Sequence, residues 1–165
     1  MYMDYNNLIN FSNIEIKEIT ENNYKLFFTE NEKKKNIIID FKNIIFPFGI
    51  EKHFNVYYLN VEINNIELIN YIKLFENNIQ SLIKTNIKYS DYSFISNIKE
   101  RNKYLPLLKT RITNKYNKFI CKTKYNLFEL ETKTTLYNIK VHVDLLWFKS
   151  SNKTFGLLWT LTCIE

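Results

Sequence analysis

LYNIKVHVDLLWFK, residues 136–149, carries the clearest strand pattern in this sequence. Side chains that alternate between apolar and polar along a chain point to opposite faces of a β-strand. The apolar positions predicted to share one face are Ile139, Val141, Val143, Leu145 and Trp147. After the polar turn SSNK (150–153), the stretch TFGLLWTLTCIE (154–165) places a second apolar set on one face, namely Phe155, Leu157, Trp159, Leu161 and Cys163. The chain is therefore predicted to end in a hairpin of two long strands.

Strand patterns also fill the first third of the chain. Residues 14–19 and 24–29 are predicted to form a hairpin, EKKK (32–35) a turn, and 36–41 a third strand. FPFGI (46–50) is predicted to be a bend in which glycine supplies backbone freedom. In residues 53–63 the alternation predicts a half-buried strand. Its apolar face would hold Tyr57, Leu59, Val61 and Ile63, and its other face Tyr58, Asn60 and Glu62.

One helix is predicted, over residues 65–84. Asn64 or Asn65 is a suitable N-cap. Apolar residues follow at helical spacing and form one stripe: Ile66, Ile69, Ile72, Phe75, Ile79, Leu82 and Ile83. The pattern in residues 85–108 is irregular and contains Pro106, which predicts a long loop. Residues 118–125 are predicted to hold a strand, and residues 126–131 either continue this strand or form a second one that pairs with it.

The length and composition are those of one globular domain spanning residues 1–165. The apolar fraction is 45% and the aromatic fraction 16%, which favours a mainly β fold with one main helix. The sequence lacks a signal peptide and a long apolar run, so an intracellular protein without membrane contact is expected. Cys121 and Cys163 are far apart in sequence, and we interpret them as packing residues rather than as a disulfide or zinc ligands.

The positive charge of the chain is concentrated in one segment. Residues 99–124 contain nine basic side chains and one acidic side chain, whereas the remainder holds 14 basic and 16 acidic ones. Such asymmetry indicates a polyanionic partner. Aromatic residues recur among these cations, and cations with aromatic rings are the combination that binds single-stranded nucleic acid. A solvated Lys-rich loop is the alternative interpretation of the segment.

The candidate binding residues are therefore of two kinds. Phosphate contacts are assigned to Lys99, Arg101, Lys103, Lys109, Arg111, Lys115, Lys118, Lys122 and Lys124. Base stacking is assigned to Tyr104, Tyr116 and Phe119, and Tyr125 is the next candidate. For each of these rings, packing in the core is the alternative role. Arg111 is the strongest of the cations, because a guanidinium pairs with phosphate and also stacks.

Motifs for catalysis are missing from the sequence. It contains neither the phosphate-loop motif G-x-x-x-x-G-K-[ST] nor the dinucleotide-binding motif GxGxxG. His53 and His142 are not spaced from each other or from nearby carboxylates as metal ligands are. We therefore predict no catalytic residue, no metal and no cofactor, and not an enzyme. A nuclease built from scattered carboxylates stays open as an alternative, because such residues need not be close in sequence.

The predicted elements fit an OB-fold-like small barrel, a fold whose strand face and loops bind oligonucleotides. Three stretches, IIFPFGIEKHFNVYYLNVEI (44–63), NIKERNKYLPLLKTRI (97–112) and WFKSSNKTFGLLWTLTCIE (147–165), resemble the OB-fold single-stranded DNA-binding proteins of nucleocytoplasmic large DNA viruses and related phages. The similar features are a PFG turn, a basic PLLKxRI element and a closing Trp hairpin.

This resemblance implies a viral protein of the host cytoplasm or nucleus that coats single-stranded DNA in replication, recombination and repair, without a cofactor. Many members carry an acidic C-terminal tail that contacts replication partners. This sequence ends in Cys163, Ile164 and Glu165, so we expect that it either lacks tail-mediated contacts with replication partners or contacts them through a different surface. Two questions are left open by the sequence: whether RNA is also a ligand, and whether the protein forms a homo-oligomer. The rival hypothesis is a β-rich interaction protein whose exposed strands pair with another chain.

Overall fold

Strands dominate the protein, whose computed structural model describes residues 13–116 and 118–165. The long strands are β1 (Ile14–Thr20), β2 (Asn23–Glu30), β4 (Ile38–Ile44), β6 (Val56–Glu62), β9 (Tyr104–Ile112), β13 (Tyr137–Lys149) and β14 (Thr154–Ile164). The short strands are β3 (Lys33–Lys35), β5 (Glu51–His53), β7 (Ser93–Ile95), β8 (Ile98–Arg101), β10 (Asn114–Lys115), β11 (Lys118–Phe119) and β12 (Lys122–Thr123). The helix is α1 (Ile66–Lys84), and three 3₁₀ turns are η2 (Ile87–Tyr89), η3 (Leu127–Glu129) and η4 (Ser150–Asn152). The prediction of a mainly β fold with one main helix is confirmed.

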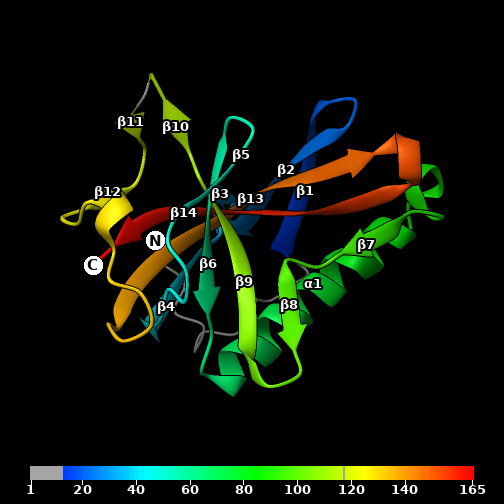
Figure 1. Cartoon of the computed structure of the whole chain (residues 1–165). Coiled ribbons are helices and arrows are strands. Elements are labelled where there is room, and N and C mark those ends of the chain that lie inside the picture. The colour runs from blue at the N-terminus through cyan, green and yellow to red at the C-terminus, as the bar shows by residue number, and fades with distance from the viewer. Residues whose placement is uncertain (1–12, 117) are drawn as a thin grey trace.

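One large sheet has the strand order β1-β2-β13-β14-β9-β6-β5, with β4 also paired to β13. Strands β9 and β14 are parallel, whereas β13 is antiparallel to β14, β2 and β4. No ladder between described residues closes this sheet into a barrel, although one bridge joins Ile45, just after β4, to Glu62 of β6. Figure 1 shows β13 and β14 crossing the middle of the molecule, with α1 at the end where β8 and β9 meet and β10–β11 at the opposite end.

The terminal hairpin forms as predicted, but its first strand changes face halfway. In β14 the five predicted residues from Phe155 to Cys163 are all buried. In β13 the register with β14 shifts between Val143 and Leu145. Beyond this irregularity Leu146 and Phe148 are buried, and the prediction that Leu145 and Trp147 face the core is wrong. A bulge adds a residue to one strand and so reverses the alternation after it.

The first hairpin, β1 with β2, is confirmed, and β6 confirms the predicted strand from residue 56 onward, with Leu59, Val61 and Ile63 buried. Residues 53–55 are instead the end of β5 and the turn to β6. Two further details are wrong. The predicted turn at 32–35 is mostly strand β3, since the reversal occurs at Asn31 and Glu32, whose φ angles are 48° and 62°. Gly49 does not take the left-handed conformation that would require a glycine. Asparagine, charged and aromatic residues in the turns and at strand ends take positive φ angles instead, among them Asn43, Phe54 and Lys153.

The helix α1 begins where the sequence predicts. The Asn65 side-chain oxygen accepts hydrogen bonds from the backbone N–H groups of Glu67, at 2.9 Å, and Leu68, at 3.1 Å. These bonds satisfy donors that the first turn leaves free. Five residues of the predicted apolar stripe are buried, namely Ile69, Ile72, Phe75, Ile79 and Ile83. The prediction is wrong for Ile66 and Leu82, which are 65% and 43% exposed. The ring of Phe75 is centred 6.0 Å from that of Trp159. Trp159 is therefore a core residue, as predicted.

The prediction of a long loop over residues 85–108 is wrong, because the segment contains η2, β7, β8 and most of β9. These strands form by pairing with distant partners: β7 with β14, and β9 with both β6 and β14. Pro106 is compatible with β9 because it lies near the start of this strand, just beyond the end of β6 at Glu62, where its missing N–H costs little; its carbonyl accepts a hydrogen bond from the Ile63 N–H, at 3.1 Å. Tertiary pairing overrides local propensity in this region. Residues 118–125 form two short strands rather than one, and 127–129 form η3.

Both cysteines are free and pack against the core. Cys163 is buried in β14, and Cys121 is half-buried beside β12, the strand that pairs in parallel with β14. Burial raises the pKa of the Cys121 thiol to about 12. A thiol with so high a pKa is a weak nucleophile at neutral pH.

Candidate nucleic-acid interface

The predicted binding residues lie in three places along and beyond β9. The hairpin of β8 and β9 carries Lys99 and Arg101 on β8, Lys103 in its turn and Tyr104 at the start of β9. The middle of β9 carries Lys109 and Arg111. The hairpin β10–β11 and the segment after it carry Lys115, Tyr116, Lys118, Phe119, Lys122 and Lys124. Because a nine-residue strand is about 25–30 Å long, the first and third groups lie at opposite ends of β9 (Figure 1).

The outward face of β6 and β9 brings cations and an aromatic ring together. In the ladder, Tyr58 of β6 is opposite Arg111, and Asn60 is opposite Lys109. The Lys109 ammonium lies 4.2 Å from the centre of the Tyr58 ring, which is within cation–π range. Between these outward residues, Leu59 and Thr110 point inward and are completely buried. The core therefore fixes which side chains of both strands face outward.

Arg111 is the least engaged of the described arginines. It is half-buried between β6 and β14, where Thr160 is its neighbour in register. Its buried Nε atom has no hydrogen-bond partner among the described residues. A guanidinium has five N–H donors in a fixed plane that matches phosphate oxygens. Arg111 can therefore donate to a phosphate at this face.

Arg101, by contrast, is engaged within the protein. Its guanidinium forms an ion pair with Glu62, and its Nε donates a hydrogen bond of 2.8 Å to the Leu105 carbonyl. It also lies over the Tyr104 ring, 5.1 Å from its centre. These contacts hold the β8–β9 turn against β6. Arg101 accordingly has fewer donors for an external phosphate than Lys99 or Lys103, both of which are exposed.

The β10–β11 hairpin places like charges opposite one another. Lys115 and Lys118 are direct partners in this two-residue ladder, and both are exposed. Like charges at directly opposite positions destabilise a strand pair. An anion bound between them would remove this repulsion. Tyr116 at the tip is 98% exposed with a φ of 52°, so its ring covers none of the core.

The other aromatic candidates differ in exposure. Tyr104 is 70% exposed, whereas Phe119 is half-buried and packs edge-on against Tyr57, with ring centres 4.9 Å apart. Tyr125 is half-buried against Tyr137, and the Lys124 ammonium lies 5.2 Å from the centre of the Tyr125 ring. Phe119 and Tyr125 thus support the hairpin and its neighbouring segment. Tyr104 and Tyr116 are the exposed rings that can stack, although Arg101 lies over one face of the Tyr104 ring.

Sequence reasoning missed two rings at this interface, one exposed and one half-buried. Phe54, in the turn between β5 and β6, is 98% exposed. Tyr58 was assigned correctly to the outward face of its strand but was not proposed as a binding residue. The alternation of residues 53–63 predicted the outward position of Tyr58, whereas the turn that exposes Phe54 had no such signal, because the predicted strand included residues 53–55. The carboxylate of Glu51 also lies here and accepts a hydrogen bond of 2.9 Å from the Asn60 amide.

Metal chemistry has no support in the geometry. No group of three or more His, Cys, Asp or Glu side chains among residues 13–116 and 118–165 is arranged to hold a metal ion.

Among residues 13–116 and 118–165, no helix has the length and apolar character needed to span a membrane. No protein-family model matches this chain, and no curated protein matches it in sequence.

Proposed function

We propose that this protein binds single-stranded DNA without sequence preference and coats it during replication, recombination and repair. The observation that carries the proposal is the Tyr58, Lys109 and Arg111 cluster on the outward face of β6 and β9. The cations neutralise phosphates, and the exposed rings stack on unpaired bases whatever the base sequence. RNA offers the same phosphates and bases, so it is the ligand to compare.

The strand arrangement supports an OB-like architecture. Five strands have the order β4-β13-β14-β9-β6, and the Ile45–Glu62 bridge links the two ends. In chain order β6 and β9 are the second and third of these five. The second and third strands, with the loop between the first and second, form the oligonucleotide face of OB-folds. Phe54 lies in the corresponding loop, at the β5–β6 turn.

Two further features support a polyanion as the partner. The Lys115–Lys118 pair is unfavourable without an anion. The rings of Tyr104 and Tyr116 are exposed at the two ends of β9, so that a strand following β9 would meet a ring at each end. Such a path extends over about 25 Å, which corresponds to several nucleotides of a single strand.

The test is a titration of labelled dT30 with the protein at several salt concentrations, followed by fluorescence anisotropy, with a duplex of equal length as the control. We expect tight binding of the single strand whose affinity falls as salt rises, and weaker binding of the duplex. Equal weak binding of both, or none, contradicts the proposal and favours the β-rich interaction protein. Strand cleavage on adding Mg²⁺ would favour the nuclease instead.

A further inference from the structure

β1 is an edge strand of the large sheet. It pairs with β2 along one side, from Ile14 opposite Phe28 to Thr20 opposite Asn23. On its other side no described residue pairs with it. Edge strands present unpaired N–H and C=O groups, which are a template for a further strand.

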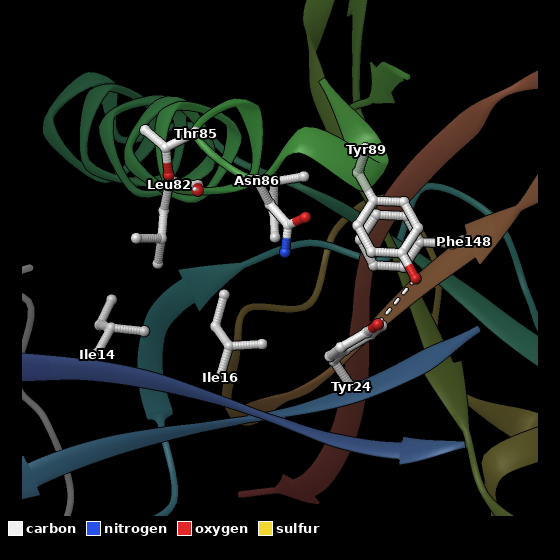
Figure 2. A pocket seen from close by; sticks show the side chains of 9 residues that line it. Ile14, Ile16, Tyr24, Leu82, Thr85, Asn86, Tyr89 and Phe148 are labelled. Atoms are coloured by element: carbon white, nitrogen blue, oxygen red, sulfur yellow. Dashed lines mark hydrogen bonds between the residues drawn. The ribbon is translucent and has the colours of Figure 1, made fainter. Parts of the chain in front are cut away.

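A pocket of about 480 Å³ opens between this strand and the end of α1. Figure 2 shows Ile14 and Ile16 on one side of it, with Leu82 and Asn86 across from them. The stacked rings of Tyr89 and Phe148, whose centres are 3.9 Å apart, close one end. The lining is mostly apolar, and Leu82 is 43% exposed. A strand added to β1 would place its side chains on that face against this pocket.

The sequence of β1 is complementary to itself in one antiparallel register. A two-fold axis perpendicular to the sheet passes through a pair of identical residues and keeps the same face outward on both copies. Axes at Glu15, Lys17 or Glu18 place like charges directly opposite one another. A two-fold axis at Ile14 or Ile19 pairs only the few residues at one end of the strand with the partner strand.

An axis at Ile16 avoids both problems. It pairs five residues of each copy, Ile14–Glu18, and places Ile16 opposite Ile16 of the partner subunit. It also places Glu15 opposite Lys17 of the partner subunit, twice by symmetry. Both of these side chains alternate with Ile14 and Ile16 and lie on the other face from the pocket.

We propose that two copies of this chain associate through antiparallel pairing of their β1 strands, centred on Ile16. The backbone groups of both edges become paired, and two Glu15–Lys17 ion pairs fix the register. Ile16 of the partner subunit packs beside Ile16 at the mouth of the pocket, and Glu18 of the partner subunit lies opposite Ile14 at its side. This interface lies apart from the β6–β9 face and does not depend on nucleic-acid binding.

The test is a charge reversal measured by sedimentation equilibrium on the full-length protein, from about 5 to 500 µM, a range that covers the affinity expected of a small interface. The wild type is expected to reach twice its monomer mass of 20.1 kDa. Lys17→Glu turns both ion pairs into repulsive pairs and should weaken the dimer about tenfold or more. The double variant Glu15→Lys with Lys17→Glu restores both pairs and should return the affinity to within about threefold of the wild type.

Two controls separate association from folding. Lys42→Glu makes the same charge change at an exposed position of β4 and should leave the mass unchanged. Glu15→Lys removes contacts with Lys34 and Thr29, so the melting temperature of each variant is measured alongside. Hydrogen exchange supplies a second readout, in which the amides of residues 14–18 become more protected as the protein concentration rises.

A protein that stays monomeric throughout this range overturns the proposal. So does a dimer that Lys17→Glu leaves unchanged, or a Lys17→Glu defect that the double variant does not rescue. Concentration-independent protection of those residue 14–18 amides that point away from β2 also overturns it, because another segment of the same chain then covers the edge.

Discussion

The indole of Trp147 lies directly over Gly156, its neighbour in the β13–β14 ladder. A Cβ atom at position 156 would come within 2.7 Å of the Trp147 Cζ2 atom and 2.9 Å of the Ile95 carbonyl oxygen. Trp147 is half-buried on the outward face because the bulge after Val143 reverses the alternation of β13. Glycine is needed here for close approach rather than for an unusual backbone angle.

Gly156→Ala should therefore destabilise the protein. The added methyl group meets the indole and a backbone oxygen, and overpacking of this kind costs about 1–3 kcal/mol. Urea unfolding measures the change. Gly49→Ala is the matched control, since a Cβ there has no atom within 4 Å, and it should stay within about 0.5 kcal/mol of the wild type. Equal effects of the two substitutions would contradict the packing argument.

Replacing Lys109 and Arg111 together by Ala should weaken single-strand binding and lower the slope of log affinity against log salt by about 1 to 2. The two side chains are neighbours on the outward face of β9, so one strand of DNA can contact both. Anisotropy at four or more salt concentrations gives the slope. Lys42→Ala with Lys149→Ala removes the same charge from exposed positions elsewhere. An unchanged slope in the first variant would place the binding surface away from β9.

Tyr116→Ala should reduce binding by about 1–3 kcal/mol, the usual contribution of one stacked base. Because its ring is 98% exposed, the free energy of unfolding should change by less than about 0.5 kcal/mol. Phe119→Ala is the comparison on the same hairpin. It removes the contact with Tyr57 and should cost about 1–2 kcal/mol of stability. A stable Tyr116→Ala variant with full affinity would exclude stacking at this tip.

Arg101→Ala should act on stability more than on binding. It leaves the Glu62 carboxylate, which is 18% exposed, without its ion-pair partner and removes the hydrogen bonds to Leu105. The expected loss is about 1–3 kcal/mol in urea unfolding. Lys99→Ala, on the same strand but exposed, should leave the free energy of unfolding within about 0.5 kcal/mol of the wild type. If Arg101→Ala lowers the salt slope while stability is unchanged, its guanidinium contacts DNA instead.

Glu76→Gln should make the protein less sensitive to high pH. Burial in α1 raises the pKa of the Glu76 carboxyl, although hydrogen bonds from Ser96 and the Asn97 N–H oppose this shift. The folded protein thus keeps a proton that the unfolded chain loses as the pH rises from the ordinary glutamate range. Stability falls over that interval, up to the raised pKa. The glutamine variant should melt at a higher temperature than the wild type at pH 8 and at a similar one at pH 4, and the reverse order would refute this account.

The local patterns of the sequence correctly predicted the elements that carry their own signal. The Asn65 cap and the apolar stripe of α1, the β1–β2 hairpin and the inward face of β14 all follow from alternation or helical spacing. Alternation and helical spacing are local signals, because each helix or strand buries one face against the core whichever element it packs against. The basic segment and most of its exposed residues were also identifiable, since charge is read directly from composition.

Only the tertiary structure decided the rest. Strands β7 and β9 form because β14 and β6 supply pairing partners from distant parts of the chain, which residues 85–108 do not reveal by themselves, and β8 then pairs with β9. The bulge in β13 turned Trp147 outward, since its position depends on the register with β14. Pairing of β6 with β9 set Tyr58 beside Lys109, and pairing with Glu62 occupied Arg101. Sequence determined which side chains were present, and long-range strand register determined which of them meet, because hydrogen-bonded partners in a sheet need not be close along the chain.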